Sequence, residues 1–368
     1  IGGELGRLAN GLGSVEKSRQ ASERLDASHF TGLDVQGANQ VTITAGTSDT
    51  IAVTTTLRGF GGTDEDAVKA LQAIRWRLHH ENGTNALISV DQPKGRRFFT
   101  GHINGQQFGN TSSVDLVIQV PARFTVKVDG NHGDVRVSGV GAAQIKTDSG
   151  RIQAEDLHGT LQAEADSGGI VGQRIAGNTT LKTDGGRITA TQITGTLVAE
   201  TDNGAIEVDG VTAQAELKTA NGRITAKQIT GPLVAETDNG AISATGAADG
   251  ATLRSKHGRI TGVRLAGAHV VAQTDTGSIS LEQPGITGTS YDLTTEHGRI
   301  GVGVTTDASL RIDLQTEHGR LDSQLPLADQ LKDDDRDRKT LKGVLKTGAQ
   351  MLHAQSKTGS ITLHAARH

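Results

Sequence analysis

Four aspartates recur at intervals of eighteen residues in this sequence, and carboxylates stacked in that way could bind calcium. They are Asp148, Asp166, Asp184 and Asp202. Calcium prefers oxygen ligands, which a column of carboxylates on successive turns of a repeat would supply. The column continues, however, with Ala220, Asp238 and Lys256, and the Gly-Gly-x-Gly-x-Asp pattern of calcium-loaded solenoids is missing. We therefore interpret these aspartates as solvated turn residues and predict no metal site.

Histidines offer a second candidate metal site. His257, His297 and His318 each precede a glycine, and the last two also follow a glutamate. If His297 and His318 lay on adjacent turns of a repeat, two imidazoles and two carboxylates could hold a transition metal. Histidine also tolerates turn geometry while facing water, and we favour that interpretation, so no cofactor is predicted.

Carbohydrate lyases and hydrolases with β-helical folds need an acid or base pair in a groove lined with aromatic side chains. After residue 125 the only aromatic residue besides histidine is Tyr291. We predict no catalytic residues and no enzyme activity, and keep a polysaccharide-active enzyme as an alternative.

Two unusual segments are candidates for binding a partner. The loop Lys94, Gly95, Arg96, Arg97, Phe98 and Phe99 combines three cations with two aromatic rings, and arginine and aromatic residues are enriched at interfaces. A second segment, residues 332–339, combines four acids with four bases. Binding loops often interrupt a rigid scaffold in this way. In the other interpretation, Phe98 and Phe99 fill a small core.

The elements that position these residues follow from an internal repeat. Residues 187–240 consist of three units of eighteen residues, each ending in glycine, and the glycines continue this period from Gly133 to Gly258 and then more loosely to Gly359. Within a unit, apolar and polar residues alternate, then break, then alternate again, which indicates strands joined by a corner. A repeat of this kind predicts a solenoid. We expect the glycines to adopt positive φ at sharp turns.

The charges at the fourteenth position of each unit distinguish a parallel coil from an antiparallel meander. The sign alternates along Lys146, Glu164, Lys182, Glu200, Lys218, Glu236 and Arg254. If each unit is one coil, these side chains stack about 4.8 Å apart, where opposite charges attract. Arginine at the first position recurs only at every second unit, as at Arg187 and Arg223. We therefore predict a parallel β-solenoid with the ladder Lys182, Glu200, Lys218 and Glu236 on one outer face.

The alternation also assigns the core. Thr183, Thr201, Thr219 and Thr237 fall on the inward side and predict an internal hydroxyl ladder. Leu197, Leu217 and Leu233 are predicted to fill one core column.

The sequence before the repeats predicts a cap at the end of the solenoid. For residues 1–28 we expect an N-terminal tail or tether, with a short helix as the alternative. For residues 29–130 we expect a strand-rich cap with one helix at about 63–73, with Thr63 as its N-cap. A hairpin is expected over residues 74–90. Residues 131–368 form the solenoid, with a charged insert at about 326–345 that breaks the period.

Composition agrees with a solenoid whose narrow core needs few aromatic residues. The 368 residues include six Phe, one Trp, one Tyr and no Cys, with a formal net charge of −4. Disulfides and thiolate sites are therefore excluded, nucleic acid is not an expected partner, and no apolar run is long enough to span a membrane. The sequence begins at Ile1, so we expect either a removed leader or a fragment.

Several stretches resemble the bacterial putative-adhesin family of β-strand repeats. They are Val-Asp-Leu-Val-Ile-Gln-Val-Pro at 114–121, Gly-Asp-Val-Arg-Val-Ser-Gly-Val at 133–140 and the Thr-Asp-Ser-Gly and Thr-Asp-Asn-Gly repeats that follow. The resemblance runs from about residue 29 to the C-terminus and implies an extracytoplasmic β-solenoid, often anchored at the envelope, with no catalytic residues to transfer.

We therefore expect a non-catalytic scaffold or adhesin-like interaction module in the periplasm or at the cell surface. Membrane association would require an N-terminal segment outside or removed from this sequence. Expected partners are a protein, a second copy of the chain at the envelope, or a surface glycan. A subunit of a larger envelope assembly or filament is the alternative.

Overall fold

The computed structural model describes residues 15–80, 84–92, 102–103, 106–107, 111–282, 289–305, 307–335 and 338–366. The chain divides into two compact units, Ile1–Ala163 and Glu164–His368. Strand β14 (Leu161–Ser167) contains the boundary between them. In the described residues, no helix has the length and apolar character that crossing a membrane requires.

Unit 1 contains two sheets and one helix. One sheet has the order β1 (Val15–Asp26), β4 (Thr50–Gly61), β9 (Thr111–Pro121), β3 (Gln40–Gly46), β11 (Val135–Ser138) and β13 (Ile152–Leu157). The other has the order β5 (Arg75–His80), β6 (Asn85–Asp91), β2 (Gly32–Gln36), β10 (Thr125–Gly130) and β12 (Ala142–Ser149). A short ribbon pairs β7 (His102–Ile103) with β8 (Gln106–Gln107).

The helix and hairpin of unit 1 match the sequence prediction. Helix α2 spans Asp64–Gln72, and the Thr63 hydroxyl caps it by accepting a bond from the Asp66 N–H. Three acidic residues in the first turn stabilise the helix, because their negative charges lie near the positive end of its dipole. Strands β5 and β6 pair antiparallel as the expected hairpin, with Trp76 opposite Val90.

The prediction of a tail or helix over residues 1–28 is wrong for residues 15–26. They form β1, which pairs antiparallel with β4 from Val15 opposite Gly61 to Asp26 opposite Thr50. Few of its side chains are covered, because the strand lies at a sheet edge, where charged residues discourage further pairing. Its polar composition concealed a strand that is stabilised mainly by backbone hydrogen bonds.

The coil pattern also begins earlier than the boundary at residue 130. Strand β2 pairs in parallel with β10, and β3 pairs in parallel with β11, so residues 32–46 already form a coil. Residues 50–121 are therefore an insertion between the first coil and the second. Its strands β6 and β9 cover the exposed edges of β2 and β3.

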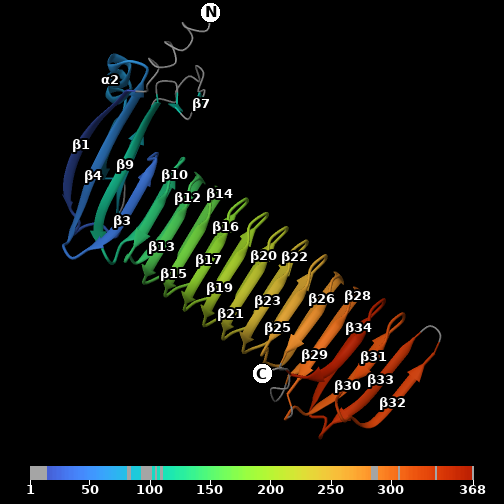
Figure 1. Cartoon of the computed structure of the whole chain (residues 1–368). Coiled ribbons are helices and arrows are strands. Elements are labelled where there is room, and N and C mark those ends of the chain that lie inside the picture. Colours follow the sequence, from blue (N-terminus) through green and yellow to red (C-terminus); the bar gives the residue numbers. More distant parts are fainter. Residues whose placement is uncertain are drawn as a thin grey trace, which may run out of the picture. The chain divides into compact units, whose positions relative to one another are not determined.

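Unit 2 consists of stacked coils in which each coil contributes a strand to each of two sheets (Figure 1). In sheet A they are β15 (Ile170–Ile175), β17 (Ile188–Ile193), β19 (Ile206–Val211), β21 (Ile224–Ile229), β23 (Ile242–Ala247), β25 (Ile260–Val263), β27 (Ile279–Glu282), β29 (Ile300–Val304), β31 (Leu321–Ser323) and β35 (Ile361–Ala365). In sheet B they are β16 (Thr179–Thr183), β18 (Leu197–Thr201), β20 (Ala215–Thr219), β22 (Leu233–Thr237), β24 (Ala251–Ser255), β26 (His269–Thr276), β28 (Ser290–His297), β30 (Leu310–Thr316), β32 (Ala328–Asp334), β33 (Lys339–Leu345) and β34 (Gln350–Ser356).

The coils are parallel and in register, as predicted. Ile188 lies opposite Ile206, and Ile206 opposite Ile224, so each step along sheet A is eighteen residues. Glu200 pairs in register with Lys182 on one side and Lys218 on the other. The chain is a parallel β-solenoid.

The core differs from the expected single leucine column. Leu197 and Leu233 stack with Ala215 between them, whereas Leu217 lies in the neighbouring column between Ala199 and Ala235. All six side chains are buried. Large and small residues thus alternate along both columns, which keeps the core volume of each coil nearly constant.

Among the closing glycines, Gly150 has the predicted positive φ, at 135°, but in most coils positive φ falls at a different position. At the sixth position of successive coils, Arg174, Gln192, Gly210, Gln228 and Gly246 have φ between 53° and 77°. The closing glycines are needed because the turns of successive coils pack too closely for a side chain. A Cβ on Gly222 would lie 1.7 Å from the carbonyl oxygen of Gly204. Close packing of successive turns therefore explains glycine there.

Candidate functional site

A trough crosses several coils on the outer face of sheet B. One wall is the charge ladder at the fourteenth position, and the other is the turn position two residues later. Side chains two apart on a strand point to the same face, so both rows project outward. The central part of the trough has a volume of about 350 Å³.

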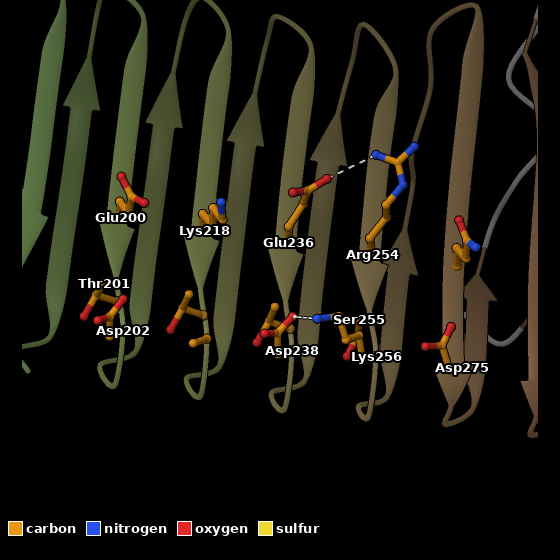
Figure 2. A pocket seen from close by; sticks show the side chains of 14 residues that line it. Glu200, Thr201, Asp202, Lys218, Glu236, Asp238, Arg254, Ser255, Lys256 and Asp275 are labelled. Carbon is orange, nitrogen blue, oxygen red and sulfur yellow. Dashed lines mark hydrogen bonds and ion pairs between the residues drawn. The ribbon is translucent and has the colours of Figure 1, made fainter. Parts of the chain in front are cut away.

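Figure 2 shows the two rows. Glu200, Lys218, Glu236 and Arg254 form the ladder row, and Asp202, Asp238, Lys256 and Asp275 form the turn row. The trough continues past Glu200 to Glu164, with Lys182 in the ladder row and Asp166 and Asp184 in the turn row. Acids outnumber bases in both parts.

Ion pairs between coils fix part of the ladder. Lys182 Nζ lies 3.0 Å from Glu200 Oε2, and Arg254 Nη1 lies 3.2 Å from Glu236 Oε1. These side chains are about half exposed, so each pair contributes at most about 1 kcal/mol. Their main effect is to hold charges of opposite sign at the spacing of the strands.

Lys218 differs from the other cations of the trough, because in the described residues it forms no ion pair within 4 Å. Its two ladder neighbours, Glu200 and Glu236, bind Lys182 and Arg254 instead. The turn row also has Ala220 beside it, which leaves an opening between Asp202 and Asp238. The regular pattern is therefore interrupted at this coil.

A second ion pair lies in the turn row. Lys256 Nζ lies 2.8 Å from Asp238 Oδ1 (Figure 2). This hydrogen bond, together with the charge of Asp238, raises the pKa of Lys256, and the charge of Asp275 acts in the same direction. Lys256 therefore remains a fixed positive charge at neutral pH.

The floor of the trough rests on the predicted hydroxyl ladder. Thr183, Thr201, Thr219 and Thr237 are buried, as expected. Each hydroxyl donates to the carbonyl of a glycine in the preceding coil and accepts from the N–H of a glycine in its own coil. The trough is thus supported by a fully bonded layer.

Neither metal candidate from the sequence forms a ligand set. In the described residues, no three histidine, aspartate or glutamate side chains lie close enough together to hold a metal ion. His297 and His318 are not on adjacent coils, because β34 lies between β28 and β30. The His297 ring instead contacts the Thr358 hydroxyl, with Nδ1 2.8 Å from Oγ1.

The loop residues Lys94, Arg96, Arg97, Phe98 and Phe99 lie outside the described residues. The charged insert is described in large part: it forms the hairpin of β32 and β33, and Lys339 Nζ lies 3.3 Å from Asp334 Oδ1. Because β33 pairs antiparallel with β30, the insert covers the end of sheet B.

Sequence reasoning found each row of the trough but not the trough itself. The ladder and the turn aspartates were treated as separate features, although Glu200 and Asp202 are two residues apart in one strand pattern. The spacing of two residues between the rows is the sequence feature that could have predicted the trough. Only the tertiary structure shows that Glu236 pairs with Arg254, so that Lys218 has no ion pair in the described part of the chain.

Two solved structures and one family are similar to this chain. A structure named as a putative cell adhesion protein from Clostridium sporogenes has 7% identity and a TM-score of 0.19, and covers 95% of this chain and 100% of its own. A putative adhesin from Bacteroides fragilis has 12% identity and a TM-score of 0.28, and covers 94% and 97%. No curated protein matches the chain. The family described as Toastrack DUF4097 matches residues 31–247 and 187–364, and the chain belongs to this family.

Proposed function

We propose that the chain is a non-catalytic scaffold or adhesin-like interaction module of the bacterial cell envelope. Its expected location is extracytoplasmic, in the periplasm or at the cell surface. The trough on sheet B is the observation that supports this proposal most directly. It is a long surface with charges at regular spacing on a rigid support.

The trough suits recognition of a partner with complementary charge. Its turn row presents Asp184 and Asp202, which form no ion pair among the described residues, at a distance of about one strand spacing, 4.8 Å. Charge complementarity across an interface mainly sets specificity and the rate of association. We propose a protein partner at the envelope, with a surface glycan as the alternative ligand.

A polysaccharide-active enzyme is the less favoured alternative. The carboxylates Glu200 and Glu236 are held in ion pairs with cations, whereas a general acid must give up a proton. No aromatic side chain lines the trough, so a sugar ring would have no stacking surface there. A subunit of a larger envelope assembly or filament remains the other alternative.

A binding assay with native envelopes of the source bacterium tests the role of the trough. The double variant Asp184→Lys with Asp202→Lys reverses charge in the turn row and leaves the pairs at Glu200 and Glu236 intact. We expect its association at low salt to fall several-fold. Asp209→Lys, a single charge reversal on the exposed outer face of sheet A, is the control for position.

The loop candidate is tested in the same assay. Replacing Arg96, Arg97, Phe98 and Phe99 with Ser removes its cations and rings. If this variant loses association at unchanged thermal stability while the trough variant retains it, binding occurs at the loop. If both variants bind as the wild type does, neither surface is the interface, and the proposal for the trough is wrong.

A further inference from the structure

The coils at the C-terminal end of unit 2 are not stacked in sequence order. Strand β34 pairs in parallel with β28 on one side and with β30 on the other. Strand β35 likewise lies between β29 and β31. The final coil, residues 350–365, is therefore inserted between two coils that precede it in the sequence.

The inserted coil fits its position as closely as any central coil does. Leu352, Ala354, Ile361 and Leu363 are fully buried. Ser356 Oγ donates to the Gly298 carbonyl at 3.0 Å, and Thr316 Oγ1 donates to the Gly359 carbonyl at 3.0 Å, so the hydroxyl ladder passes through the coil without interruption.

Without this coil, unit 2 would contain a slot about two strand spacings wide, roughly 9.6 Å. Both walls of the slot would be unpaired strand edges, β28 and β29 on one side and β30 and β31 on the other. Unpaired edges next to exposed apolar side chains bind further strands readily. The sequence that matches both walls in register is the coil itself.

The inserted coil is joined to the rest of the chain by a short hinge. Residues 346–349 cross the start of β30, because β33 and β34 lie on opposite sides of that strand. Lys346 has φ of 56° in this hinge, a conformation that carries a steric cost for a non-glycine residue. An extended hinge would relieve that cost.

Among the described residues, two histidine side chains of the coil lie near carboxylates of other coils. His364 Nε2 lies 3.3 Å from Glu282 Oε1, and His353 Nδ1 lies 3.9 Å from Asp313 Oδ2. The coil is therefore held mainly by backbone pairing and by its buried apolar side chains.

We propose that the C-terminal coil exchanges between two copies of this chain, so that each copy fills the slot of the other. Every strand pair and buried contact of the coil is then reproduced between copies, and only the hinge changes. Exchange of an identical element is a route to dimers that needs no new interface. This proposal goes beyond the interaction function above and does not depend on the trough.

The sequence provides a direct test, because the chain contains one methionine, Met351, and no cysteine. Met351 lies in β34 opposite Arg311 of β30, and both side chains are exposed. One copy carries Arg311→Cys with a nitroxide spin label. The second copy is wild type with a ¹³C-labelled methionine methyl group. The two are unfolded together and refolded at high concentration.

If the coils exchange, the label of one copy lies beside Met351 of the other. We expect the methyl signal of the dimer fraction to fall by about half, the statistical share of mixed dimers, and to recover when the nitroxide is reduced. A chain that carries both labels is the positive control, because its signal is lost without exchange. An undiminished signal in the mixed sample, or monomers only, would overturn the proposal.

Hinge length gives a second readout. Inserting Gly-Gly-Ser after Thr347 lengthens the hinge and removes strain from the monomer, in which the coil fills the slot of its own chain. We therefore expect a lower dimer fraction, measured by size-exclusion chromatography with light scattering. The same insertion after Asp249, in the turn that joins β23 to β24 within one coil, is the control. If the hinge insertion leaves the dimer fraction unchanged, the dimer forms by another surface and coil exchange is wrong.

Discussion

The Thr219 hydroxyl joins two successive coils at their turns. Its Oγ1 donates to the Gly204 carbonyl of the preceding coil at 3.1 Å and accepts from the Gly222 N–H of its own coil at 3.1 Å. The side chain is 3% exposed. A single buried hydroxyl therefore satisfies two backbone groups that the glycine turn would otherwise leave unpaired.

Replacing Thr219 with Val should lower the free energy of unfolding by about 1–3 kcal/mol, because two buried backbone groups lose their partner. Thr219→Ser is the matched control: Ser255 holds the equivalent position in a later coil and donates to Gly240 at 3.0 Å. Urea unfolding measures both. Equal stability of the Val and Ser variants would show that the hydroxyl is not required.

Replacing Gly222 with Ala should destabilise the protein by at least about 1–3 kcal/mol, because the new Cβ would overlap the Gly204 carbonyl of the preceding coil. Gly185→Ala is the control, since a Cβ at Gly185 meets no atom within 4 Å. Thermal unfolding of the two variants compares them. A Gly222→Ala variant as stable as Gly185→Ala would contradict the close approach of the turns.

Replacing Leu217 with Asp should cost several kcal/mol, because it places an unpaired charge in a fully buried column. Glu216→Asp on the outer face of the same strand should change stability by no more than about 0.5 kcal/mol. The denaturant midpoints of the two variants and the wild type measure both changes in stability. Unchanged unfolding of the Leu217 variant would mean that this column faces solvent.

Replacing Gln192 with Gly should stabilise the protein by about 0.5–1 kcal/mol, because Gln192 has φ of 56° while Gly210 holds the same position in the next coil. Thr191→Gly, one residue earlier in the strand, should instead destabilise, since glycine gains nothing there. Matched urea titrations measure the difference. A loss of stability in both variants would refute the role of positive φ.

Exposed segments and domain boundaries were predicted less well than the repeat. The polar composition of residues 15–26 predicts a tail, yet they form β1 by pairing with β4. The strands of residues 32–46 were assigned to a cap because they lack the repeat punctuation, although they stack on β10 and β11 as a coil. In both cases backbone hydrogen bonds to distant strands outweighed local composition.

The sequence by itself determined the parallel coil, the charge ladder of Lys182, Glu200, Lys218 and Glu236, and the buried threonines, because these depend on a period that places like positions one strand spacing apart. Only the tertiary structure decided three further features. Leu217 lies beside the column of Leu197 because the residue two positions further along a strand faces the same core. Among the described residues Lys218 forms no ion pair, because Glu200 pairs with Lys182 and Glu236 pairs with Arg254. The last coil lies between two earlier ones because strand edges pair by register and space, and sequence order does not constrain which edge a terminal strand fills.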